Sequence, residues 1–106
     1  MCGMVLACDI QAIGALQRPR YNDLVSRLRP AMQDRRELPD GYDYLLDAGE
    51  ITLPEVAEWI NMERLCCPFL IFQIEVSGEV CRLMLRGPDG AKALLRAEFP
   101  VGGQVG

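Results

Sequence analysis

Residues 63–69 read Glu-Arg-Leu-Cys-Cys-Pro-Phe, and this short stretch marks a corner in the chain. A helical pattern leads into it, and a run of apolar residues leads out of it. Pro68 stops the helix, because proline has no N–H to donate and its ring clashes with the preceding turn. Cys66 and Cys67 are therefore expected at an element boundary, where a fold can present side chains for chemistry.

The pattern before the corner predicts a helix over residues 53–66. Thr52 and Glu55 have the spacing of a capping box at its start. Continuing the expected buried stripe by three and four residues reaches Glu63 and Cys67. A carboxylate on the inward side, one turn before a thiol, departs from simple amphipathic patterning. The stripe itself is expected to contain Val56, Ala57 and Ile60, with Trp59 at its margin.

The pattern after the corner predicts a β-hairpin from residues 69–76 and 79–86, joined by a two-residue turn at Ser77-Gly78. One face of this hairpin is almost wholly apolar and carries Cys81. The other face is expected to place Gln73 opposite Arg82. The expected pairs are Val76 with Glu79, Ile74 with Cys81, Phe72 with Leu83, and Leu70 with Leu85.

The remaining elements follow from periodicity and turn signals. Pro30 lies inside the first helical pattern and is expected to kink that helix or to end it and start a second one. The element order strand, helix, strand, helix, strand, strand, helix predicts one α+β domain over residues 1–99, with a mixed sheet of about four strands and helices on one face. The additional elements are a strand over 4–10, a helix over 17–35, a turn over 37–41, a strand over 42–47, a helix over 91–99 and a flexible tail over 100–106.

Composition limits the classes of function. A chain of 106 residues fits a single core, and no apolar run is long enough to span a bilayer. The net charge is −4 and the arginines are scattered, so no nucleic-acid partner is expected. The N-terminus lacks the pattern of a secretory signal, which predicts a cytoplasmic location. The five cysteines are then expected as reduced thiols, and an odd count argues against a closed set of disulfides.

The absence of histidine narrows the chemistry further, because any metal site must use sulfur and carboxylate. Thiolates are soft ligands that suit Zn²⁺, Cu⁺ and heavier thiophilic ions. Cys66 and Cys67 alone would satisfy a two-coordinate ion such as Hg²⁺. A structural zinc ion takes four ligands, and the candidates for the others are Cys8, Cys81 and Glu63, none in a CxxC spacing.

Electrostatics at the corner favours metal binding over thiol catalysis. A helix C-terminus carries partial negative charge, and Glu63 adds to it, so both raise the pKa of a nearby thiol. A bound cation reverses that balance. The alternative is that the cysteines only pack, since free cysteine behaves as a small buried hydrophobe, and that Glu63 pairs with an arginine.

The chain resembles a family of small uncharacterised bacterial proteins. The resemblance covers residues 8–99, and its most specific part is Glu-Arg-x-Cys-Cys-Pro-Phe at 63–69. Similar proteins are encoded near metal- or mercury-resistance functions, which implies thiol–metal chemistry without identifying a reaction. Pro30 and the Gly-rich tail depart from the family pattern. The other segments that carry the resemblance are residues 37–42, 57–60 and 85–90.

Three functions stay open from the sequence. The leading hypothesis is a cytoplasmic thiol protein that binds a soft heavy-metal ion, Hg²⁺ or Zn²⁺, or a small thiophilic ligand, and sequesters it or hands it over. Its ligands are Cys66 and Cys67, assisted by Cys81 or Cys8, with Glu63 as a weak ligand or neighbour. The second is a thiol-dependent reductase or a small-molecule enzyme that uses Glu63 as acid and base. The third is an interaction module, such as a homodimer, with structural cysteines.

Overall fold

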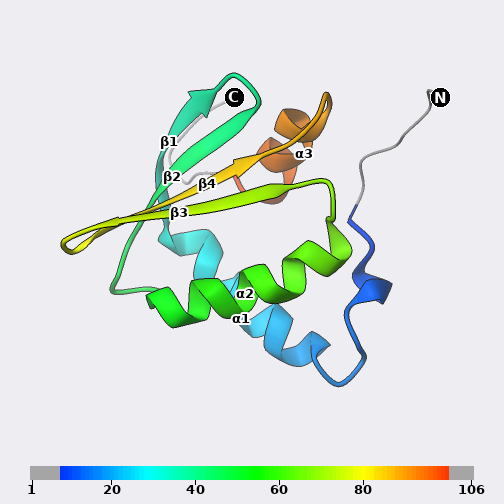
Figure 1. Ribbon diagram of the computed structural model, residues 1–106. Helices are drawn as coiled ribbons and strands as arrows, with labels where there is room; N and C mark the ends of the chain where they lie inside the picture. Colours follow the sequence, from blue (N-terminus) through cyan, green and yellow to red (C-terminus); the bar gives the residue numbers. More distant parts are fainter. Residues whose placement is uncertain (1–7, 101–106) are drawn as a thin grey trace.

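Three α-helices pack on one four-stranded antiparallel sheet in the computed structural model, which describes residues 8–100 (Figure 1). The strand order is β1-β2-β4-β3. The expected α+β domain with four strands is confirmed, but the sheet is antiparallel rather than mixed, and the order of elements is α-β-β-α-β-β-α. The helices are α1 (Arg18–Ala31), α2 (Leu53–Cys66) and α3 (Ala91–Glu98), and the strands are β1 (Met32–Leu38), β2 (Gly41–Leu46), β3 (Ile71–Ser77) and β4 (Val80–Arg86).

The helices cover a single face of the sheet, as the sequence predicted. Tyr42, Leu85 and Phe72 form one row across β2, β4 and β3, so their side chains share a face. Trp59 of α2 packs edge-on against Phe72 with ring centroids 5.8 Å apart. Lys92 of α3 lies over the ring of Tyr42 on the same face, 5.5 Å from its centroid. Helix α1 packs beside α2 and completes this layer (Figure 1).

The strand predicted over residues 4–10 is wrong where the structure describes it; residues 4–7 lie outside the described residues. Ile10–Ala12 forms a short 3₁₀ turn instead. Asp9 starts this turn, because its carboxylate accepts a hydrogen bond from the Gln11 N–H at 3.1 Å. Such a local bond between side chain and backbone competes with a strand, and apolar alternation alone does not reveal it.

The helix predicted over residues 17–35 is too long. Helix α1 ends at Ala31, and the chain continues as strand β1, whose Met32 pairs with Leu46 of β2. Pro30 explains the stop: it removes a helical N–H, and one residue later the helix ends without a second helix forming. The turn predicted over 37–41 is shorter than expected, because β1 extends to Leu38. A bulge between Gln33 and Arg36 interrupts the pairing of this edge strand.

The hairpin of β3 and β4 is confirmed, with its register shifted by two residues. Ser77 pairs with Val80, so the turn residues are Gly78 and Glu79 rather than Ser77 and Gly78. Gly78 has a φ of +60°, a conformation that glycine adopts without a steric penalty. A shift of two residues keeps every side chain on its predicted face. The pairs are now Phe72 with Leu85, Ile74 with Leu83, Val76 with Cys81, and Glu75 rather than Gln73 with Arg82.

Helix α2 has the predicted bounds and the predicted start. Thr52 and Glu55 form both hydrogen bonds of the capping box. The buried stripe is rotated relative to the prediction, because Trp59 is fully buried and Ala57 is exposed. The buried face of α2 continues to the end of the helix, where it includes the carboxylate of Glu63 and the thiol of Cys66. The buried residues of α2 are Val56, Trp59, Met62, Glu63 and Cys66.

Candidate metal centre

The last turn of α2 supplies three of the site's side chains. Glu63 and Cys66 lie three residues apart on the buried face of the helix. Cys67 is the C-cap, and its N–H donates to the Glu63 carbonyl at 2.8 Å. Pro68 follows and cannot continue the helix, so Cys67 leaves helical geometry and its sulfur lies 3.6 Å from that of Cys66. The sequence left open whether these two cysteines share one pocket, and the structure brings their sulfurs together.

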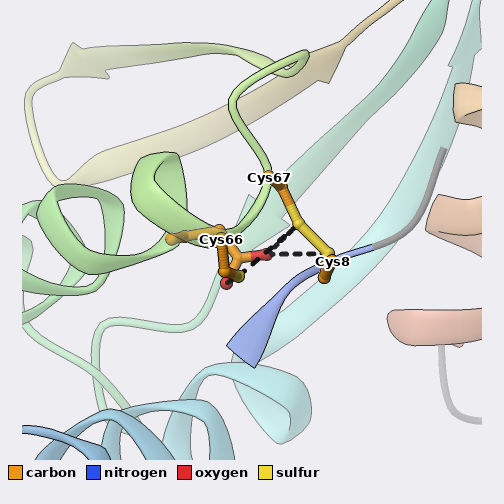
Figure 2. Close-up of side chains that lie close together, drawn as sticks. Cys8, Cys66 and Cys67 are labelled. Carbon is orange, nitrogen blue, oxygen red and sulfur yellow. Dashed lines mark hydrogen bonds between the residues drawn. A yellow bond between two sulfur atoms is a disulfide. The ribbon is translucent and has the colours of Figure 1, made fainter. Parts of the chain in front are cut away.

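The fourth side chain comes from the N-terminal segment. The Asp9 N–H donates to the Cys66 carbonyl at 2.8 Å, which anchors this segment against the end of α2. Cys8 forms a disulfide with Cys67, 59 residues later, and the two Cα atoms lie 4.8 Å apart. The expectation that all cysteines are reduced is therefore wrong for this pair; within the described residues Cys66 and Cys81 are the free thiols. Figure 2 shows that the side chains of Cys8, Cys66 and Cys67 lie close together, with the disulfide bond between Cys8 and Cys67.

Glu63 occupies the centre of the group and is 2% exposed. The Tyr21 hydroxyl donates to Glu63 Oε1 at 2.6 Å. Glu63 Oε2 faces the sulfurs of Cys67 and Cys8 at 3.3 and 3.8 Å, and Oε1 lies 3.6 Å from the sulfur of Cys66. After reduction of the disulfide, both Cys8 and Cys67 can donate to this carboxylate.

Glu63 has no cationic partner of the kind weighed from the sequence. Among residues 8–100, none of the ion pairs includes this carboxylate. Burial raises the pKa of Glu63, and the hydrogen bonds from Tyr21 and Cys66 only partly offset that effect. The carboxyl group therefore favours its neutral form at the pH where an exposed glutamate is already ionised.

Cys66 is a protonated thiol rather than an activated nucleophile. Burial, followed by the charge of Glu63, raises the pKa of Cys66 to about 12. The enzymatic hypothesis requires a thiol with a lowered pKa, and Cys66 shows the opposite shift. Burial and the neighbouring Glu63 also raise the pKa of Tyr21, which keeps its hydroxyl as a donor.

The group can hold a metal ion once the Cys8–Cys67 disulfide is reduced. One ligand atom from each of Cys8, Glu63, Cys66 and Cys67 lies within 4.8 Å of every other. Three sulfurs and one oxygen form a soft donor set of the number that zinc prefers, and any two of the thiolates suffice for a linear ion. Ionisation of the buried thiols and of Glu63 is unfavourable without a cation, and a bound cation supplies the missing positive charge.

Cys81, the remaining cysteine predicted as a ligand, is not part of this group. It lies near the start of β4, paired with Val76 and Leu46, and lines a separate cavity of about 310 Å³. Tyr21 was missed as a site residue. It recurs with Leu24, Val25 and Leu28 at the three- and four-residue spacing of an apolar helix face, a pattern that predicts a core residue. The only signal for its role was a hydroxyl on a helix face predicted to be buried.

A cavity of about 530 Å³ opens beside the group. Cys8 and Cys66 border this cavity, whereas Cys67 does not. Its other walls come from α1, from α3 and from Ile10 of the 3₁₀ turn, and they combine apolar and polar side chains with one cation and one anion. Those walls include Tyr21, Val25, Arg29, Leu94 and Glu98.

Comparison with known proteins identifies no relative: no family model matches the chain, and neither a curated protein nor a solved structure matches it. None of the helices within residues 8–100 is long and apolar enough to cross a membrane. Function is therefore inferred from the chemistry of the site.

Proposed function

We propose that the reduced protein binds one soft metal ion, such as Hg²⁺ or Zn²⁺, through Cys8, Cys66 and Cys67, with Glu63 as a fourth ligand or a close neighbour. The supporting observation is the convergence of three sulfurs and a carboxylate within 4.8 Å at the end of one buried helix. The protein then sequesters the ion or passes it to another thiol site.

Binding requires the disulfide to open first. Addition of two electrons and two protons to the Cys8–Cys67 bond returns two thiols, which then join Cys66. The metal must next displace protons, because only the thiolate binds and the pKa of Cys66 is about 12. Affinity is therefore expected to rise with pH and to vanish in the oxidised protein, where only one of the three sulfurs is a thiol.

The test is a titration of the reduced protein with Hg²⁺ or Zn²⁺ by calorimetry, after the reductant has been removed. We expect about one ion per chain, together with proton release that appears as a dependence on the ionisation enthalpy of the buffer. Replacing both helix-end cysteines, Cys66→Ser with Cys67→Ser, should weaken binding by more than about 100-fold, since loss of outer-shell partners alone costs about 10–100-fold.

Cys81→Ser is the matched control, because it makes the same substitution at a partly buried cysteine outside the group. It should leave both affinity and stoichiometry unchanged. Unchanged affinity and stoichiometry in the Cys66→Ser, Cys67→Ser variant would contradict metal binding at this site. The interaction-module hypothesis stays a prediction.

A further inference from the structure

We propose that the cavity beside the cysteine group binds a small zwitterionic thiol, an amino acid or short peptide with a free sulfhydryl, and directs its sulfur onto Cys8. This activity goes beyond metal binding, because it acts on the closed disulfide and needs no ion. It supplies the opening reaction, which frees the thiol of Cys67 and leaves Cys8 in a mixed disulfide. A second equivalent of the same small thiol then releases the thiol of Cys8 and forms the ligand's own disulfide. The geometry of the cavity, its paired charges and the unequal burial of the two disulfide sulfurs each support it.

The cavity has the size and length of such a ligand. Its volume of about 530 Å³ falls in the range of about 300–1,000 Å³ that is typical of small-molecule sites. Tyr21, Val25 and Arg29 follow one another at four-residue spacing and so line it along one face of α1. Eight residues of helix rise about 12 Å, which gives room for a peptide of up to about three residues.

A positive and a negative charge lie side by side on the cavity wall. The Arg29 Nη2 atom and the Glu98 Oε1 atom are 3.8 Å apart, which is longer than a hydrogen bond, and both side chains are about half exposed. Arg29 Nε already donates to the Glu98 backbone carbonyl at 3.1 Å, while the terminal nitrogens of Arg29 and the carboxylate of Glu98 retain the capacity for a further partner. The guanidinium suits a ligand carboxylate and the carboxylate suits a ligand ammonium group, so the pair matches a zwitterion. Asn22 and Ser26 add an amide and a hydroxyl to the same wall.

The disulfide offers only one of its residues to this cavity. Cys8 is half-buried and borders the cavity, whereas Cys67 is fully buried and does not border it. A thiolate bound in the cavity therefore reaches the sulfur of Cys8 first. Leu94 and Val25 supply apolar contacts for the methylene group that carries the ligand's sulfur.

The exchange is balanced without another oxidant or reductant. The incoming thiol loses its proton to solvent, and its sulfur attacks Cys8 Sγ. A bond forms between the ligand sulfur and Cys8, and the Cys8–Cys67 bond breaks. Cys67 leaves with the electron pair as a thiolate and takes up a proton. The ligand's sulfur is oxidised to the mixed disulfide, and the sulfur of Cys67 is reduced to a thiol.

The test uses the oxidised full chain without metal, so its result is independent of the proposed metal binding. Glutathione, cysteine or 2-mercaptoethanol is added at equal thiolate concentration, and the freed Cys67 is counted by alkylation during unfolding and by mass spectrometry. We expect the rate to saturate with glutathione or cysteine and to rise linearly with uncharged 2-mercaptoethanol. S-methylglutathione, which keeps the ammonium group and the carboxylates but has no thiol to exchange, should inhibit the reaction with glutathione.

Variants at the charged pair sharpen this result. Arg29→Gln should slow the reaction with dilute glutathione about tenfold, the effect of one charge-assisted hydrogen bond, and leave the rate with 2-mercaptoethanol unchanged. Glu98→Gln should act in the same direction. Arg36→Gln, at an exposed arginine of β1, is the matched control and should change neither rate. A rate linear in glutathione, an Arg29→Gln variant that reacts like the control, or a mixed disulfide on Cys67 would each overturn the proposal.

Discussion

Trp59 and Glu63 lie on the same buried face of α2, one helical turn apart, yet their burial has opposite energetic effects. Trp59 is fully buried and packs edge-on against Phe72 and Phe99, with ring centroids 5.8 and 5.7 Å away. Burial of the apolar surface of this ring stabilises the fold, although the indole N–H is buried without a hydrogen-bond partner among the described residues. Glu63 is almost as buried, and desolvation of its carboxyl group disfavours ionisation. The helix therefore obtains stability from its middle and places reactive groups in its last turn.

Truncation in the middle of the helix should have the largest effect on stability. Trp59→Ala leaves a cavity between α2, β3 and the segment after α3, and should lower the free energy of unfolding by about 3–5 kcal/mol. Urea denaturation of the oxidised protein measures this loss. Asn61→Ala, at an exposed position of the same helix, is the control and should be nearly neutral. A similar loss in both variants would mean that Trp59 does not anchor the core.

Removal of the disulfide should have the next largest effect, at the Glu63 end of the helix. The bond joins cysteines 59 residues apart, and its loss in Cys8→Ser should cost about 2–4 kcal/mol, chiefly by releasing the unfolded chain. Urea midpoints with and without reductant measure it. Reductant should destabilise the wild type and the control Cys81→Ser, but not Cys8→Ser. If reductant leaves the wild type unchanged, the bond does not contribute to the stability of this corner.

The parts of the fold that the sequence predicted are those with local signals. Helix α2 has a capping box at its start and a proline after its end, and the β3–β4 hairpin combines alternation with a glycine turn. Strand β1 could not be found in the same way. Its residues continue a helical pattern, and only their pairing with β2, together with the effect of Pro30, makes them a strand.

The residues of the candidate site also fall into those with a local sequence signal and those that only tertiary packing brings to the site. Glu63 and Cys67 lie one helical turn apart, so helical spacing predicted that they share a face of α2. Whether Cys66 and Cys67 share one pocket was left open by the sequence, and the structure places their sulfurs 3.6 Å apart. Cys8 and Tyr21 arrive from other segments, through the anchored N-terminal chain and the packing of α1 beside α2. No spacing rule distinguishes Cys8 from Cys81 as the third thiol, and the structure brings only Cys8 to the group.

The pH dependence of the free energy of unfolding tests how much the burial of Glu63 disfavours its ionisation. We expect this to be the smallest of the three effects on stability. Burial raises the pKa of Glu63, so in the pH range above the ordinary glutamate value the native protein keeps a proton that the unfolded chain has lost. The free energy of unfolding then falls as pH rises through this range, by up to about 1.4 kcal/mol per pH unit from this group. Above the raised pKa the loss is complete.

Glu63→Gln removes this dependence, because the amide cannot ionise and can still accept the Tyr21 hydrogen bond. We expect the free energy of unfolding of this variant, relative to the oxidised wild type, to increase from pH 4 to pH 8. Cys66 stays protonated over this range, since its pKa is about 12, so the change reports Glu63. Glu79→Gln, at an exposed glutamate of the hairpin turn, is the control and should show a constant difference. A constant difference for Glu63→Gln as well would mean that the carboxyl group ionises at no cost. Burial of Glu63 would then carry no electrostatic penalty, and Trp59 and Glu63 would differ only in how their side chains pack.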